Sequence, residues 1–348
     1  MVDRKIYPSL DIMKFIMAML ILTQHTSNEW ACSTGLVHDI FGLGNFAVPF
    51  FFSCSGFLFF SKLNTLNSEE QKAYYKKWSF RIGKMYLVWS LIYFCFVFAG
   101  WLDQGIQIEK VLNYVHRAIV YSTYATIWFL PALWIGVSIC YWLRRHVRGG
   151  FLWTVMMILL VVGNIFGSYS DVVIRQPAIE SFYNWYMDIF ITWRNGLFNG
   201  APYVFIGVLL ADGYGKHISR NLSLAAAALF GSLFLAEAFA ITRLDLSNAT
   251  DQGFMMWPSI FFLMNMLIKT DVPQRPLWIH CRNLSMLIFL GQRLFLSAIP
   301  GVLPACVKET IMGWPEFSIY LFFVAIVLAF SITVEQLSSR YKFLKILW

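Results

Sequence analysis

Lys14 and His25 are two residues of the first apolar segment whose side chains a lipid environment disfavours. They stand 11 residues apart in DIMKFIMAMLILTQHTSN, residues 11–28, so in a helix their side chains point to within about 20° of each other. Along the helix axis they are separated by roughly 16 Å, about half the thickness of the hydrocarbon layer. A polar stripe therefore links the inner end of this helix to its outer half, which is typical of a helix lining a cavity.

Each of these residues has a structural and a chemical interpretation. A histidine inside a membrane can simply donate a packing hydrogen bond, and a lysine near the end of a span can extend to the headgroups. Sharing one face favours chemistry, because neutral imidazole can accept a proton from a hydroxyl or amine near pH 7. Arg81 and Lys84, at the start of the third apolar segment, add two cations. With Lys14 they form a candidate phosphate site, in which arginine makes bidentate contacts and lysine supplies point charge.

Candidates for contact with a second substrate lie at the opposite side of the membrane. Arg194 and Asn195 begin the sixth apolar segment, and Trp128 begins the fourth. An arginine or tryptophan at this level is equally typical of an interfacial anchor. In the second segment, Ser55 and Gly56 indicate a close approach by another helix in mid-membrane.

The elements that must position these residues are membrane helices. Hydrophobic residues make up 58% of the 348 residues and charged residues 13%, and the mean hydropathy is +0.60, which exceeds what a soluble fold can bury. The long first apolar run lacks a small-residue cleavage site, so no cleavable signal is expected. Hydropathy predicts ten spans, at about 9–27, 40–61, 85–101, 126–143, 151–168, 195–212, 222–242, 253–268, 285–300 and 316–334. The predicted fold is therefore an all-α polytopic membrane protein, with about ten transmembrane helices around a polar cavity.

The distribution of positive charge gives an independent prediction of topology. Of the 27 Lys and Arg residues, 19 fall in one set of alternate loops and five in the other. Since positive residues collect on the cytoplasmic side, both termini are predicted to be cytoplasmic. The net charge of +8 then reflects topology and attraction to anionic lipid, and it requires no nucleic-acid partner.

We expect a single integral membrane domain over residues 1–348, because no linker or low-complexity tract interrupts the spans. No internal repeat is evident, which weakens a transporter interpretation. The six cysteines form no CxxC motif and no histidine stands at metal-ligand spacing, so no metal site is expected. Cys32 and Cys306 both fall on the outer side, and the sequence leaves their pairing open.

Several of these stretches together resemble the acyltransferase-3 family of membrane O- and N-acyltransferases, which modify bacterial surface polysaccharides and related acceptors. The family's basic residue, ten-residue spacer and histidine match Lys14 and His25. Its basic pair before the third span matches Arg81 and Lys84, and its Trp-Phe-Leu at the fourth span begins here at Trp128. Its proline, aromatic and Ser-Gly motif in the second span is matched by Pro49, Phe50, Phe51, Phe52, Ser55 and Gly56.

Two later stretches refine this resemblance. The segment RNGLF, residues 194–198, is similar to the membrane domain of the vancomycin-resistance serine racemases, a branch of the same family. Their soluble racemase domain has no counterpart in these 348 residues. The family's late histidine is replaced by Gln292, so the resemblance implies no catalytic role at that position.

The resemblance implies an acyl-CoA-dependent O- or N-acyltransferase of the bacterial cytoplasmic membrane, multi-pass and in contact with membrane lipids. The donor would be a cytoplasmic acyl-CoA, with acetyl-CoA the leading candidate and no metal required. The acceptor would be a hydroxyl or amine of a cell-surface or lipid-linked glycan or of a small molecule. A homo-oligomer is left open. The residues implied are His25 as general base, Lys14, Arg81 and Lys84 for the CoA phosphates, and Arg194, Asn195, Trp128 and Ser55 for the acceptor side.

Two other classes of function remain open at this point. A transporter or exporter of a small anion or lipid-linked glycan could use the same basic stripe as its path. A membrane anchor or sensor would need no chemistry at all. Turnover of acyl-CoA by the purified protein distinguishes the enzyme from both alternatives.

Overall fold

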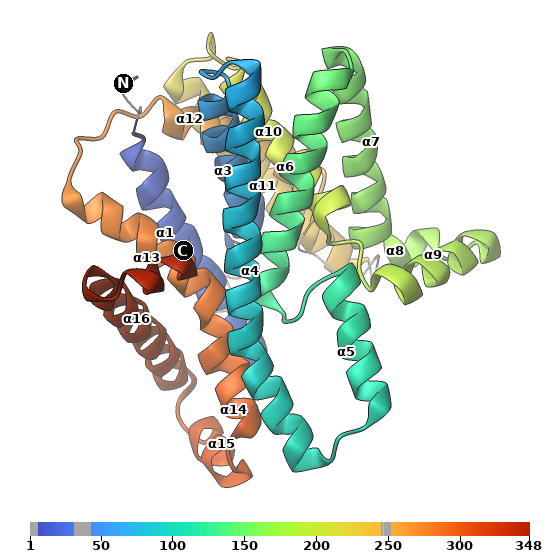
Figure 1. Ribbon diagram of the computed structural model, residues 1–348. Coiled ribbons are helices and arrows are strands. Elements are labelled where there is room, and N and C mark those ends of the chain that lie inside the picture. The colour runs from blue at the N-terminus through green and yellow to red at the C-terminus, as the bar shows by residue number, and fades with distance from the viewer. Residues whose placement is uncertain (1–5, 31–42, 245, 247–251) are drawn as a thin grey trace. The chain divides into compact units, whose positions relative to one another are not determined.

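The computed structural model describes residues 6–30, 43–244, 246 and 252–348, and in these parts of the chain every regular element is a helix (Figure 1). The predicted all-α fold is therefore confirmed for the described residues. The elements are α1 (Pro8–Trp30), α3 (Ala47–Leu63), α4 (Ser68–Gln104), α5 (Ile108–Val120), η1 (Thr126–Trp128), α6 (Phe129–His146), α7 (Gly149–Ser168), α8 (Ser170–Val173), α9 (Pro177–Phe190), η2 (Gly196–Gly200), α10 (Ala201–Ala211), α11 (Arg220–Arg243), α12 (Met256–Ile268), α13 (Pro276–Arg293), η3 (Leu294–Ala298), α14 (Ile299–Val302), α15 (Ala305–Met312), α16 (Glu316–Arg340) and η4 (Lys342–Leu347).

Each predicted span overlaps a helix. Within the described residues, six helical stretches are long and apolar enough to cross a membrane, which fits a polytopic membrane protein. They are Ser68–Gln104, Thr126–His146, Gly149–Ser168, Arg220–Arg243, Pro276–Val302 and Glu316–Arg340. Three further apolar helices are shorter, and α1 spans 23 residues. The total of ten spans and the cytoplasmic position of both termini remain predictions.

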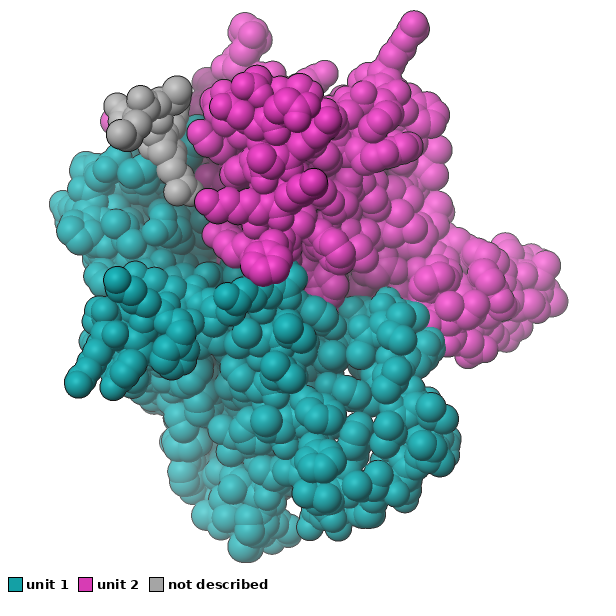
Figure 2. All heavy atoms as spheres, in the orientation of Figure 1, with its two compact units in different colours: residues 1–47, 83–127, 272–348 teal, residues 48–82, 128–271 magenta. Residues whose placement is uncertain are grey.

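The chain divides into two compact units, coloured separately in Figure 2. Unit 1 comprises residues 1–47, 83–127 and 272–348, and unit 2 comprises residues 48–82 and 128–271. Neither unit is a continuous segment, since the chain passes from one to the other within α4 and again in later connections. That the whole chain forms one domain remains a prediction.

In unit 1, α1 packs beside α13, and α16 packs against both. The Trp30 indole donates a hydrogen bond to the Leu296 carbonyl (3.0 Å), so the carboxyl-terminal ends of α1 and α13 meet and the two helices run in the same direction. Helix α16 runs the opposite way, because its first half brings Phe323 to Trp30 (ring centroids 4.6 Å apart) and its last part brings Glu335 to His280.

The second half of α4 belongs to the same unit and contributes two fully buried aromatic side chains. Trp89 donates through its indole to the Leu347 carbonyl (3.0 Å), and the Tyr93 hydroxyl donates to the Leu290 carbonyl (2.6 Å). Large aromatic groups with a polar atom are stable in an interior only when that atom finds a partner. These two bonds therefore fix α4 to α13 and to the end of the chain.

Unit 2 is packed through glycines that let helices touch backbone to backbone. A Cβ atom on Gly56 of α3 would lie 2.6 Å from the Val204 carbonyl oxygen of α10, and one on Gly207 would collide with the α3 backbone at Phe57. Only the absence of a side chain permits this approach. The close helix contact predicted from Ser55 and Gly56 is therefore confirmed.

Candidate active site

Helix α1 carries both residues of the predicted polar stripe. It is unbroken from Pro8 to Trp30, so helix geometry keeps Lys14 and His25 on one face, and both are half-buried. The Lys14 ammonium lies 3.2 Å from the Asp11 carboxylate one turn earlier, and the side chains of this pair are 14% and 9% exposed. Lys14 thus already has a counter-ion, with which a phosphate would have to compete. Its assignment to the CoA phosphates remains a prediction.

One turn after His25, α1 carries Glu29, an acidic residue that the sequence analysis did not identify as part of the site. Glu29 accepts an ion pair from Arg293 at the end of α13, with side chains 21% and 17% exposed. Residues four apart on a helix are neighbours, so His25 lies next to Glu29 on α1. An ionisable residue in a membrane segment is a functional-site hypothesis by default. The sequence did show Arg293 at the edge of a span, but nothing in it indicated which acid it meets.

Gln292, which replaces the family's late histidine, is completely buried beside Arg293. Its amide nitrogen donates to the Phe289 carbonyl (3.0 Å), whereas its amide oxygen is buried with no hydrogen-bond partner among the described residues. A buried acceptor without a donor costs free energy unless water or a substrate supplies one. This oxygen is therefore a candidate acceptor for a bound hydroxyl or amine.

Further polar side chains extend this arrangement inside unit 1. The Gln24 amide nitrogen lies 2.7 Å from the Asn45 amide oxygen, and the hydroxyls of Thr23 and Tyr320 lie 3.1 Å apart. The Gln24–Asn45 pair adds to the pairs of Lys14 and Glu29 along α1, whereas Thr23 lies about 180° from Lys14, on the opposite face of the helix. The structure thus places a polar interior where the stripe was predicted, while a polar cavity remains a prediction.

The basic pair Arg81 and Lys84 lies on α4, one turn apart, and both side chains are exposed. Both therefore reach solvent at the end of the apolar part of this helix. Lys84 belongs to unit 1 with Lys14, whereas Arg81 belongs to unit 2. A common phosphate site for the three cations remains a prediction.

In unit 2, Asn195 organises the start of the sixth predicted span. Its side-chain oxygen accepts from the amides of Leu197 (2.9 Å) and Phe198 (3.1 Å), which caps the π-helical turn η2. Its nitrogen donates to the Tyr186 hydroxyl (2.7 Å) and to the Thr192 carbonyl (3.2 Å). Burial raises the pKa of Tyr186, so the phenol stays neutral and can accept this bond. The structure therefore gives Asn195 a positioning role, and direct contact with an acceptor remains a prediction.

The other three predicted residues of the acceptor side also lie in unit 2. Arg194 is exposed next to this cap. Trp128 is half-buried, with its ring edge-on to Phe52 of α3 at 6.1 Å between centroids. Ser55 is half-buried one turn after Phe52 on the same helix. Contact of Trp128 and Ser55 with a substrate remains a prediction.

A comparison with known families decides what kind of protein holds this arrangement. The family model for the acyltransferase domain of acyltransferase-3 proteins matches residues 7–335. The chain belongs to the acyltransferase-3 family. The match covers α1 with Lys14 and His25 and extends almost to the end of α16, so this acyltransferase-3 protein carries the family's domain over nearly its whole length.

Three curated relatives are similar to this acyltransferase-3 protein. An amino-acid racemase from Enterococcus faecalis is 28% identical over 272 residues, which cover 77% of this chain and 37% of the relative. A serine/alanine racemase from Enterococcus gallinarum is 26% identical over 70% of this chain and 34% of the relative. A further amino-acid racemase from Enterococcus faecalis is 23% identical over 84% and 41%. The chain therefore spans roughly two fifths or less of the relatives it matches, and no solved structure matches it.

Metal-ligating residues and cysteines complete the description. In the described ranges, no group of three or more His, Cys, Asp or Glu side chains could hold a metal ion. Cys306 is an exposed free thiol, and Cys32 lies outside the described residues.

Proposed function

We propose that this protein transfers an acyl group, with acetyl the leading candidate, from a cytoplasmic acyl-CoA to a hydroxyl or amine. The acceptor is a cell-surface or lipid-linked glycan or a small molecule, and the enzyme works in the bacterial cytoplasmic membrane. One observation carries the proposal: in a chain matched to the acyltransferase domain, His25 lies one turn before the Glu29–Arg293 pair in the polar interior of unit 1.

In the proposed reaction His25 is the general base. Its imidazole removes the proton from the acceptor hydroxyl or amine while the acceptor oxygen or nitrogen attacks the thioester carbonyl. The new C–O or C–N bond forms, the C–S bond breaks, and the CoA thiolate leaves with the proton that His25 has taken. Glu29 and Arg293 fix α1 against α13, so the imidazole is held in place.

The other predicted residues divide between donor and acceptor. Lys14, Arg81 and Lys84 hold the phosphates of acyl-CoA at the inner side. Arg194, Asn195, Trp128 and Ser55 serve the acceptor side, Asn195 through the cap it forms at η2. Because the relatives are named as racemases of amino acids, including serine, an amino acid with both hydroxyl and amine is a small acceptor worth testing.

The experiment that tests the proposal measures CoA release from acetyl-CoA by the detergent-purified protein, together with CoA binding. We expect His25→Ala to bind CoA as the wild type does but to lose turnover, and Lys14→Ala to bind CoA more weakly. Asn28→Ala, an exposed change on the same helix, is the matched control and should keep both properties. If the wild type and all variants fail to bind CoA, the enzyme proposal is wrong and the transporter alternative replaces it.

A further inference from the structure

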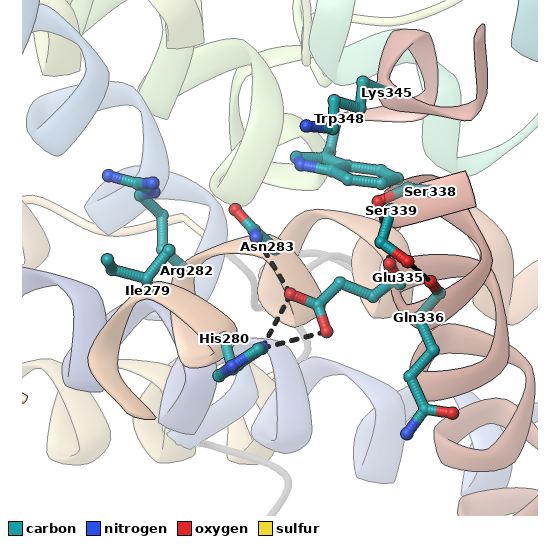
Figure 3. Close-up of a pocket in the computed structure, with 10 residues that line it drawn as sticks. All are labelled: Ile279, His280, Arg282, Asn283, Glu335, Gln336, Ser338, Ser339, Lys345 and Trp348. Carbon is teal, nitrogen blue, oxygen red and sulfur yellow. Dashed lines mark hydrogen bonds and ion pairs between the residues drawn. The ribbon is translucent and has the colours of Figure 1, made fainter. Parts of the chain in front are cut away.

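A polar pocket in unit 1 lies outside the arrangement around His25. It has a volume of about 560 Å³ and is formed by the first turns of α13, the last turns of α16 and the end of the chain after η4 (Figure 3). This volume is in the range of small-molecule sites in proteins. By the charge bias of the loops, these helix ends are on the cytoplasmic side, the side on which a cytoplasmic donor arrives.

Glu335 lies at the base of the pocket, and its carboxylate already has hydrogen-bond partners. The Glu335 side chain is 10% exposed, and its oxygens accept from His280 Nδ1 (2.8 and 2.9 Å) and from the Asn283 amide (3.0 Å). Because a carboxylate only accepts, His280 must carry its proton on Nδ1 here. Glu335 is therefore fixed by two hydrogen-bond donors, and its carboxylate oxygens are already occupied.

Two cations of the pocket have no acidic partner. Arg282 of α13 and Lys345 of η4 are exposed, and within the described residues neither side chain makes an ion pair. Lys14, by contrast, is paired with Asp11. Figure 3 shows Arg282 on one side of the pocket and Lys345 on the other, with the Glu335 cluster between them. An anionic ligand between Arg282 and Lys345 would offset both charges without displacing an existing partner.

The apolar residues that line the pocket indicate which second chemical group the anionic ligand contains. The half-buried Trp348 indole lies beside Lys345, and Ile279, 50% exposed, faces the pocket from α13. Aromatic rings bind nucleic-acid bases by stacking in a sequence-tolerant way. A phosphate alone would leave this apolar wall unused, whereas a phosphorylated purine nucleoside uses the cations and the wall together.

We propose that this pocket binds the phosphorylated nucleoside end of the donor, with its 3′-phosphate on Arg282 and Lys345 and its base against Trp348, while the diphosphate stays with Lys14, Arg81 and Lys84. The inference rests on the proposed function, because it assumes that acyl-CoA is the donor. It deepens that function by separating the nucleotide site from the reacting thioester near His25.

The test is equilibrium binding of adenosine 3′,5′-bisphosphate to the full chain in phosphatidylcholine nanodiscs. The Arg282→Gln/Lys345→Gln double variant should weaken binding at least about tenfold. The matched control is Arg275→Gln/Lys342→Gln, which removes the same charges from α13 and η4 outside the pocket and should leave binding within about twofold. Trp348→Leu should weaken the nucleotide about tenfold and leave inorganic pyrophosphate unchanged.

Further outcomes separate this inference from the proposed function. Unchanged nucleotide binding in the double variant overturns the inference. Turnover of acetyl-CoA by that variant with an unchanged KM also overturns the inference, but it leaves the proposed function standing. If the double variant loses affinity for phosphatidylglycerol nanodiscs but keeps the nucleotide, the pocket binds a lipid headgroup and the inference is wrong. If the double variant loses the nucleotide while the wild type turns over no acyl-CoA, the nucleotide site is supported and the proposed function is overturned.

Discussion

Units 1 and 2 use their polar residues differently. In unit 1, titratable side chains meet each other between helices, as Glu29 does with Arg293 and Glu335 with His280. In the interior of unit 2, side-chain oxygens mainly cap backbone: Asn195 caps η2, and Glu237 of α11 accepts from the amides of Phe254 and Met255. The comparison teaches that Glu29 and Glu335 of unit 1 join helices through side-chain pairs, whereas Asn195 and Glu237 of unit 2 fix backbone turns. The Arg144–Asp212 ion pair is an exception in unit 2.

The largest effect is expected at His25. His25→Ala should lower turnover by roughly 10²–10⁴-fold, the usual contribution of a positioned general base, while the thermal stability in detergent changes little. The measurement is CoA release under saturating acetyl-CoA, with Asn28→Ala as the control. Turnover that survives the substitution would mean that the proton-carrying group lies elsewhere, and the contrast between the units would fail.

The next largest effect is expected at the Glu29–Arg293 pair. Arg293→Gln should lower the free energy of unfolding by about 3 kcal/mol, because it leaves the Glu29 carboxylate uncompensated in a largely buried position. Adding Glu29→Gln should recover much of that loss, since both charges are then gone. Unfolding of the single and double variants in mixed micelles measures this coupling, and a double variant no more stable than Arg293→Gln would contradict it.

In unit 2, the addition of one methyl group should lower the free energy of unfolding by a comparable amount. Gly207→Ala should destabilise the fold by about 2–3 kcal/mol, because the added Cβ collides with the α3 backbone. Gly150→Ala in the first turn of α7 has nothing within 4 Å of its Cβ and should be neutral or slightly stabilising. The same unfolding assay compares the two, and equal effects would show that α3 and α10 do not pack so tightly.

The smallest effect is expected at Asn195. Asn195→Ala should cost about 1 kcal/mol of stability through loss of the η2 cap, and Asn195→Asp, which keeps the accepting oxygen, should cost less. Melting temperature and acceptor KM are measured together. An unchanged melting temperature with a raised acceptor KM would place Asn195 in contact with the acceptor and blur the distinction between the units.

Much of the fold was predictable because it follows from local pattern. Long apolar windows predict helices, and the 11-residue spacing of Lys14 and His25 fixes their common face as soon as α1 is helical. Partners distant in sequence were not predictable. The sequence gives no sign that Glu29 meets Arg293, or that Arg144 pairs with Asp212 at 2.6 Å. Side-chain partners of this kind depend on helix packing, which periodicity does not encode.

The same limit explains the acceptor side. Asn195 looked like a substrate residue because it follows an arginine at the edge of a span, yet all its hydrogen-bonding capacity is used within unit 2. The pocket at Arg282 and Lys345 was also missed, since its lining comes from segments more than 50 residues apart that carry ordinary topology charges.

The length of α4 has a consequence for the donor. Its 37 residues extend about 56 Å, against a hydrocarbon thickness of about 30 Å. In the predicted topology its first turns therefore project beyond the lipid, with Arg81 and Lys84 at headgroup level. Acyl-CoA, the proposed donor, and anionic lipid headgroups are both negative, so the surface potential would set the concentration of acyl-CoA at that level. We therefore expect the apparent affinity for acyl-CoA to fall as the fraction of anionic lipid rises and to recover when salt screens the membrane charge.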